Sequence, residues 1–340
     1  MSRKTQRIMF AAAAIAVLAA FTGCQNISYS KLAANYHFGK ANSFFRENKY
    51  RQAITEYEAT LKYNPKLTQA YQFLGESYKQ LFKPGVDTPL NKDLEKKTIE
   101  ALTKALSIEP NNKDLIYSLG DMYDKLKKFP EAEKLYLRII DIQPENMSNY
   151  YVLADFYKRY IGLQPGMDKK AESMYLRRIE TDPENPQGYA YAANYYENLP
   201  ASAENIDQAI ANYDKANDFW GKRIALQPDN AEAWLARGVN RWNRAYRFQT
   251  RPGVPPEQMK QERLRVAMEA KAAIEKAMAL DPSYPEPYAH MSPLYKAVLA
   301  QLEPEKAERY SAEADRFIDK YNELRKRAAD RKKLEEELKK

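Results

Sequence analysis

The residue types that most often carry out catalysis are scarce in this chain and lie far apart. His37 and His290 are its two histidines, and Cys24 is its single cysteine. These counts exclude a metal site built from clustered Cys and His residues. The sequence also lacks a Gly-rich phosphate loop and a GxSxG nucleophile elbow. We therefore expect no catalytic residues, no bound metal, no cofactor and no small-molecule substrate, so the sequence predicts a protein that is not an enzyme.

Cys24 stands at the end of a segment with the features of an export signal. Arg3, Lys4 and Arg7 give this segment a positive start, and the 14-residue apolar run from Ile8 to Phe21 follows. Such a run is too short to span a bilayer but has the length of a signal-peptide core. The alternative is an ordinary signal peptide with a cysteine there by coincidence.

The sequence Phe21-Thr22-Gly23-Cys24 resembles the cleavage site of bacterial lipoproteins, although Phe21 stands where leucine is usual. The resemblance implies cleavage of residues 1–23 and lipidation of Cys24. Residues 24–33 would then form a short tether to the membrane. Gln25 after the cysteine favours the outer membrane, with the protein facing the periplasm.

Acidic and aromatic residues recur at helical spacing in the middle of the chain. Asp114, Tyr117, Asp121 and Asp124 are separated by three, four and three residues, so they share one helical face. The adjoining helical segments carry equivalent residues, namely Glu76 before this stripe and Tyr151 and Asp155 after it. Such a surface suits a basic or polar peptide segment. A solvated face with no partner is the alternative.

One segment has apolar residues at the positions of this stripe. They are Leu235, Val239 and Trp242. Exposed apolar stripes of this kind mark contacts. Either a partner binds here, or the chain's own C-terminal segment from Lys306 onward covers the stripe, and the second reading is favoured because that segment is itself amphipathic.

The segments that carry these stripes belong to a repeat. Six similar phrases, each ending an amphipathic run, contain Pro65, Pro110, Pro144, Pro183, Pro228 and Pro282. The clearest interval, from Pro110 to Pro144, is 34 residues, and a period of about that length is typical of a helical solenoid. Each unit of a solenoid buries its apolar face against its neighbours, which favours an extended binding surface.

The repeat that ends at Pro144 shows the pattern most clearly. Its first predicted helix carries Ile116, Leu119, Gly120 and Tyr123, and its second carries Ala132, Tyr136 and Ile139. This pattern resembles the tetratricopeptide repeat, in which a helix pair shows Leu-Gly/Ala-x2-Tyr and then Ala, an aromatic residue and a closing Pro. In that family the first helices line a concave groove, so the resemblance implies that the stripes face the groove.

The resemblance extends over most of the chain and predicts its organisation. We expect an all-α fold, a right-handed superhelical solenoid of six to seven helix pairs at residues 34–302, with a capping and charged helix at 303–340. Pro293 should kink or end the first helix of the seventh pair. Intervals longer than 34 residues predict insertions near residues 83–93, 161–167, 199–205 and 247–262.

The charge of the chain is mild. Its net charge is +8 over 340 residues, and removal of the first 23 residues leaves about +5. Because this excess is small and the segment at the start favours export, we expect no nucleic-acid partner. The sequence thus predicts a non-catalytic scaffold for protein–protein interaction, lipid-anchored in the bacterial envelope, with envelope proteins or peptide segments as partners. The alternative is an accessory protein that binds peptidoglycan or another glycan beside a cell-wall enzyme.

Overall fold

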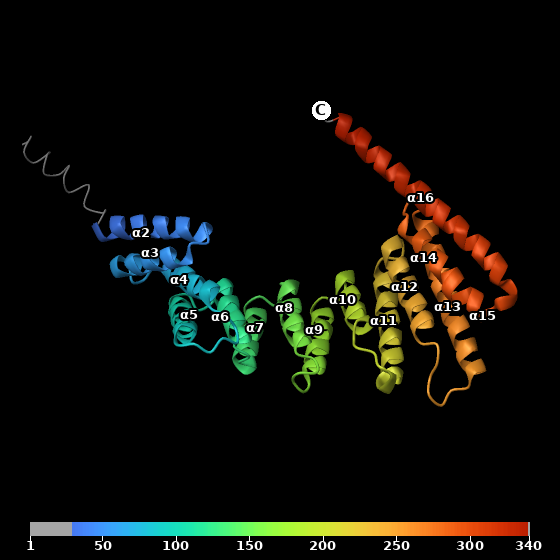
Figure 1. Ribbon diagram of the computed structural model, residues 1–340, viewed down its shortest axis with the longest axis horizontal. Coiled ribbons are helices and arrows are strands. Elements are labelled where there is room, and N and C mark those ends of the chain that lie inside the picture. Colours follow the sequence, from blue (N-terminus) through green and yellow to red (C-terminus); the bar gives the residue numbers. More distant parts are fainter. Residues whose placement is uncertain (1–28, 339–340) are drawn as a thin grey trace, which may run out of the picture. The chain divides into compact units, whose positions relative to one another are not determined.

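The computed structural model describes residues 29–338, and within this range the chain consists of helices and connections without a β-strand (Figure 1). The predicted signal segment and Cys24 lie outside the described residues. None of the helices in residues 29–338 is both long and apolar enough to cross a membrane. The chain forms two compact units, unit 1 up to Leu153 and unit 2 from Ala154.

Unit 1 contains three successive helix pairs. The first helix of each pair contacts the first helix of the next, so these helices form one surface of the unit. The next helix, α8 (Met147–Arg159), contains the boundary between the two units. The three pairs are α2 (Tyr29–Arg46) with α3 (Tyr50–Tyr63), α4 (Thr68–Leu81) with α5 (Pro89–Ile108), and α6 (Lys113–Lys125) with α7 (Phe129–Ile142).

The third pair shows why the helices pack as pairs. Leu119 and Ala132 are buried at the contact of α6 and α7. Gly120 lies against the ring of Tyr136, where a Cβ atom would be 3.0 Å from Tyr136 Cε1. The turn between the two helices places Lys127 at φ 57°, and Pro130 follows in the first turn of α7. Small residues at the predicted positions therefore allow the two helices to approach closely.

The repeated phrases end one pair and begin the next. Asn112, the last residue of one phrase, caps α6, and its Oδ1 accepts a hydrogen bond from the backbone N–H of Asp114 at 3.1 Å. Asn185 and Asn230 cap the first helices of later pairs in the same way. An asparagine at this position stabilises a helix N-terminus by about 1 kcal/mol. Three of the phrases thus supply the cap of the helix that follows, whereas α4 and α14 begin without a side-chain cap.

The segments expected as insertions contain connections and also turns of helix. Residues 82–88 connect α4 to α5, and the first turns of the 20-residue α5 follow. Residues 248–255 precede α13, a helix of 25 residues. The extra length is thus shared between loops and longer second helices. The other two segments form the connections at 160–166 and 198–205, and residues 29–33, expected in the tether, are the first residues of α2.

Unit 2 continues the same alternation of helices. Consecutive helices pack against one another, from α9 with α10 to α13 with α14. The elements are α9 (Met167–Thr181), α10 (Pro186–Glu197), η1 (Ala203–Asn205), α11 (Ile206–Leu226), α12 (Ala231–Arg247), α13 (Pro256–Leu280), α14 (Glu286–Leu294), η2 (Tyr295–Leu299), α15 (Ala300–Leu302), η3 (Pro304–Lys306) and α16 (Ala307–Leu338).

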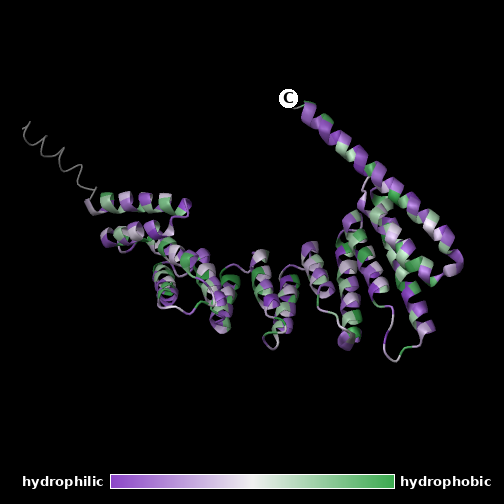
Figure 2. Ribbon diagram, in the orientation of Figure 1, coloured by the Kyte–Doolittle hydropathy of each residue, from purple (hydrophilic) through white to green (hydrophobic). Residues whose placement is uncertain are grey.

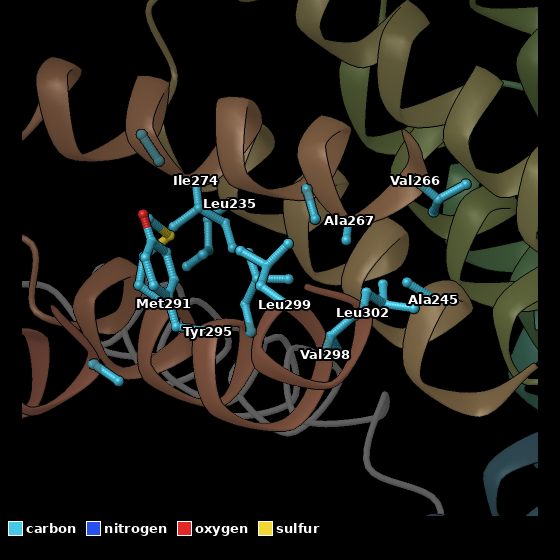
Figure 3. Packing of buried hydrophobic residues seen from close by; sticks show 14 residues of the cluster. Leu235, Ala245, Val266, Ala267, Ile274, Met291, Tyr295, Val298, Leu299 and Leu302 are labelled. Atoms are coloured by element: carbon cyan, nitrogen blue, oxygen red, sulfur yellow. The ribbon is translucent and has the colours of Figure 1, made fainter. Parts of the chain in front are cut away.

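An apolar cluster at the C-terminal end of unit 2 includes the predicted apolar stripe (Figure 3). Leu235 is 7% exposed, and Val239 and Trp242 are partly buried against the same cluster. The covering residues come from α13, α14 and η2, among them Met291 and Tyr295. The stripe is therefore covered by the chain itself. The expected segment contributes in part, because α16 packs on α14 and η2 and adds the buried Ala314 to the same cluster.

Pro293 changes the helix type without ending the helical run. It lies inside α14, and the next residues, η2, form a π-helical turn. Proline has no N–H and its ring crowds the preceding turn, and a wider π turn is one way to relieve this. Of the expected kink or end, the structure shows that α14 ends at Leu294, one residue after Pro293, while the helical run continues as a π-helical segment.

Helix α16 supplies the C-terminal cap that the sequence predicts. Ala314 and Leu324 are buried on its inner side. Beyond Arg325 its described residues are exposed and mostly charged, and the hydrophilic colour of this end is plain in Figure 2. All-helical packing in successive pairs confirms the predicted solenoid fold. The right-handed sense of the superhelix stays a prediction.

Candidate functional site

Two of the predicted stripes lie side by side on the first-helix surface of unit 1. Lys79 of α4 joins them, because its Nζ lies 3.0 Å from Glu76 Oε2 and 3.1 Å from Asp121 Oδ2 of α6. The same ammonium group donates a hydrogen bond of 2.9 Å to Ser118 Oγ. The side chain of Lys79 is only 9% exposed. The structure therefore brings Glu76 and Asp121 together, around one nearly buried lysine.

This contact corrects the expectation of an exposed acidic stripe. Asp121 also pairs with Lys125 at 2.5 Å, and its side chain is 26% exposed. Burial alone would raise the pKa of Asp121, but the hydrogen bonds and charges of Lys125 and Lys79 outweigh it and hold the pKa below its usual value. Asp124 is buried and has interaction partners of its own. Three of the predicted acids are thus already neutralised or covered.

Asp114 and Tyr117 stay accessible and line a pocket of about 150 Å³ in unit 1. The side chain of Tyr117 is 48% exposed, and its ring centroid lies 5.9 Å from that of Tyr136. The pocket lies between α6, α7 and the N-terminal part of α8. Its lining residues are Lys113, Asp114, Tyr117, Tyr136, Ile139, Asn149 and Val152.

The polar groups around this pocket are held in place. Lys113 Nζ donates to Gln143 Oε1 at 2.5 Å, so this lysine is held by the residue that follows α7. Asn149 Nδ2 donates to the backbone oxygen of Gln143 at 3.0 Å. Among residues 29–338, Asp114 forms no ion pair. The pocket therefore offers a carboxylate acceptor beside an aromatic ring, which suits a basic or amide-bearing side chain.

The predicted residues of α8 are placed differently. Tyr151 is half-buried and has interaction partners. Asp155 belongs to unit 2, is exposed, and pairs with Arg159 of the same helix at 2.7 Å. Such an exposed pair on one helix contributes about 0.3–0.5 kcal/mol.

The two histidines have packing roles in the structure. His37 Nδ1 lies 2.7 Å from Glu56 Oε2, and the side chain is 26% exposed. His290 contacts the ring of Trp242, and burial lowers its pKa. Within the part of the chain that the structure describes, no group of three or more His, Cys, Asp or Glu side chains could hold a metal ion.

A charged network lies inside unit 2. Arg241 is 3% exposed and donates to Asp214 Oδ1 at 2.8 Å and to the backbone oxygen of Tyr213 at 2.7 Å. Glu197 accepts hydrogen bonds from Trp220 Nε1 at 2.6 Å and from Asn240 Nδ2 at 2.7 Å. Burial raises the pKa of Glu197 in spite of these bonds and of the charge of Arg241. The network ties α10, α11 and α12 together and has a structural role.

Sequence reasoning did not show how several residues of the unit 1 surface contribute to it. Lys79 stands three residues after Glu76 on the same predicted face. This spacing alone indicates that the positive charge of Lys79 could neutralise the carboxylate of Glu76. Tyr136 was assigned to the core. The structure shows that it is buried, as expected, and that it also lines the pocket. Lys113, Asn149 and Val152 carry no signal of their own, because their place at the pocket depends on how α6, α7 and α8 pack.

Comparison with known proteins supports the repeat assignment. Residues 96–155 match one model of the tetratricopeptide repeat family, and residues 38–80 match a second. The chain therefore contains tetratricopeptide repeats, as its sequence pattern predicts. Folds of this kind are typically non-catalytic interaction scaffolds. No curated protein sequence matches the chain.

Several solved structures resemble the fold. The C-terminal part of a TPR repeat-containing protein from Cytophaga hutchinsonii is 14% identical, with 83% of this chain and 93% of that chain covered at a TM-score of 0.49. MamA is 19% identical, with 59% and 94% covered at a TM-score of 0.40. YrrB, a TPR protein with an unusual peptide-binding site, is 22% identical, with 59% and 90% covered at a TM-score of 0.36.

Proposed function

Because two segments of this chain are tetratricopeptide repeats, we propose that the protein is a non-catalytic interaction scaffold of the bacterial envelope. In this proposal a lipid on Cys24 anchors the protein in the outer membrane, facing the periplasm. The protein positions other envelope proteins or peptide segments for the assembly or secretion of envelope components. Proteins built from this repeat generally bind peptides and other proteins, which is the activity proposed here.

One observation supports peptide binding more than any other. The first helices of unit 1 form a continuous surface, and the pocket of Asp114 and Tyr117 opens on it next to the ion pairs of Lys79. An extended peptide could place one basic or amide side chain against Asp114 and Tyr117. Its backbone could then run along α6, where Asp121, held by Lys79 and Lys125, offers a fixed polar group. Charge at the pocket would set the register of the peptide, and the tyrosine would supply contact area.

The anchor is supported by the sequence alone. The positive start, the short apolar run and the single cysteine at its end occur together and in the right order. More than one acyl chain, at about 0.8 kcal/mol per buried methylene, would hold the protein on the membrane stably.

The binding proposal is tested with a displayed library of random peptides and the purified chain. We expect enrichment of peptides with a basic or amide residue at one position. Asp114→Lys and Tyr117→Ala should each weaken binding of the selected peptides at least tenfold, as measured by fluorescence anisotropy. Glu131→Lys is the matched control, because Glu131 is an exposed acid in the first turn of α7 just as Asp114 is in the first turn of α6.

Two results would contradict the binding proposal. If the selected peptides bind equally well to the wild type and to both pocket variants, the binding surface lies elsewhere. If the library yields no binder and the chain sediments with insoluble peptidoglycan, the glycan-binding alternative is favoured.

The anchor is tested separately. Metabolic labelling with palmitate should mark the full-length chain, and Cys24→Ser should abolish the label. The wild-type protein should fractionate with the outer membrane. A wild-type protein that is soluble and unlabelled would refute the anchor and leave the peptide-binding proposal standing.

A further inference from the structure

The first described helix of unit 1 has an aromatic outer face. Tyr29, Leu32 and Tyr36 follow one another at spacings of three and four, so they share one side of α2. Their exposed fractions are 76%, 56% and 66%. The opposite side of the helix carries Ala34 and Ala41, which are buried against the rest of the unit. We call Tyr29, Leu32 and Tyr36 the aromatic face.

The two rings of this face contact neighbouring rings, His37 of α2 and Tyr63 of α3. Tyr29 meets Tyr63 of α3 edge-on at 6.2 Å, and His37 stacks on Tyr63 at 5.7 Å. Tyr36 meets His37 edge-on at 5.4 Å. Tyr63 itself is 37% exposed. The cluster is therefore a set of amphipathic rings at one corner of unit 1, where α2 and α3 lie together (Figure 1).

The charges near the aromatic face are positive or neutralised. Helix α2 contains no Asp or Glu, and it contains Lys31, Lys40 and Arg46. The acid that faces it from α3 is Glu56, which pairs with Lys40 at 2.6 Å and with His37. A surface of this composition is not repelled by anionic lipid headgroups. Tyrosine is also enriched where proteins meet the headgroup region of a bilayer.

We propose that the aromatic face lies in the headgroup region of the membrane to which Cys24 is anchored. This inference rests on the proposed lipid anchor. Tyr29 follows Cys24 by five residues, and five residues reach at most about 18 Å. The start of α2 therefore stays within a short distance of the bilayer surface. The lipid fixes the chain to the membrane, and the aromatic face orients α2 and unit 1 on it.

The inference is tested with spin labels on the lipidated full-length chain in vesicles of phosphatidylethanolamine and phosphatidylglycerol. Cys24 is the only cysteine and would carry the lipid, so an introduced cysteine is the single free thiol. Leu32→Cys and Tyr36→Cys place the nitroxide on the aromatic face. Gln52→Cys is the control, because Gln52 is exposed on α3 away from this face. Labels at 32 and 36 should be severalfold less accessible than the label at 52 to a water-soluble nickel relaxant, and more accessible to oxygen.

The outcomes separate the inference from the anchor on which it rests. If the chain binds the vesicles and the three labels are equally accessible to nickel, the anchor stands and the inference is wrong. If labels at 32 or 36 show dipolar broadening between molecules, a second copy covers the face and the inference is again wrong. A wild-type chain that carries no lipid refutes the anchor and the inference together.

Discussion

Gly238 offers a direct test of how closely the helices of one pair approach each other. It lies in α12, at the small-residue position of the repeat pattern, and it is fully surrounded. A Cβ atom added there would lie 2.5 Å from Ile274 Cγ1 and 3.2 Å from both the backbone oxygen of Ala270 and the backbone nitrogen of Ile274. The side chain of Ile274 could turn, but the backbone of α13 would have to move. We therefore expect Gly238→Ala to push α12 and α13 apart.

The magnitude follows from two opposing effects. Alanine is favoured over glycine inside a helix by about 1 kcal/mol. Overpacking of a well-filled core costs about 1–3 kcal/mol, and more where backbone must shift. For Gly238→Ala the second effect should dominate and lower the free energy of unfolding by up to about 2 kcal/mol. For a helical glycine with open space around it, only the first effect remains, and the free energy of unfolding should rise.

Gly221 in α11 supplies this control, because a Cβ atom added there would meet nothing within 4 Å. Both variants are compared with the wild type by urea denaturation followed by circular dichroism. Amide hydrogen exchange of α12 and α13 is measured in parallel, because solenoids can unfold locally. We expect faster exchange in α12 and α13 for Gly238→Ala and a higher denaturation midpoint for Gly221→Ala.

The reasoning fails if Gly238→Ala is as stable as Gly221→Ala and its exchange in α12 and α13 is unchanged. That result would mean that α12 and α13 do not meet at Gly238, and the helix pair would then be wrongly placed. A loss of stability in both variants would mean that alanine destabilises these helices even where a Cβ atom has open space. The result would then give no support to a close approach of α12 and α13.

Three further predictions concern stability. Asp121→Lys should lower the free energy of unfolding by about 1–3 kcal/mol in urea denaturation, because it leaves Lys79 and Lys125 facing a third positive charge; an unchanged midpoint would contradict these ion pairs. Glu197 has a raised pKa in the folded protein, so its contribution to stability should be lost as pH rises from about 4 through that pKa. Glu197→Gln should flatten this decline in thermal melts recorded across pH. Asn112→Ala should cost about 1 kcal/mol in the same denaturation assay, since it removes the cap of α6.

The repeat and its core could be predicted because they depend on local rules. The step of three and four residues assigns Leu119 and Ala132 to buried faces, and a helix pair needs small residues such as Gly120 at its closest point. The fold follows from these positions alone. The phrase around Pro110 also has a local cause, because a proline ends one helix and Asn112 caps the next.

The candidate site was less predictable because its properties depend on contacts between helices. Periodicity places Glu76 and Asp121 on equivalent faces, but it does not say that Lys79 lies between them. The pocket beside Asp114 has the same origin, since its walls come from three helices. Asp114 and Tyr117 are exposed as the stripe predicts, whereas Asp124 is buried. The charges of Glu76 and Asp121 are neutralised by Lys79.

The first and the last described helices, α2 and α16, differ in the polarity of their exposed surfaces. Terminal helices of a solenoid need a polar outer face to stay soluble. Helix α16 follows this rule, because its exposed residues after Arg325 are mostly charged. Helix α2 departs from it, because Tyr29, Leu32 and Tyr36 are exposed on a helix without acidic residues. If Cys24 carries the proposed lipid, the apolar surface that begins five residues after it would have a use at the membrane, whereas the same surface in water would favour association. The composition of α2 therefore supports the proposed membrane contact.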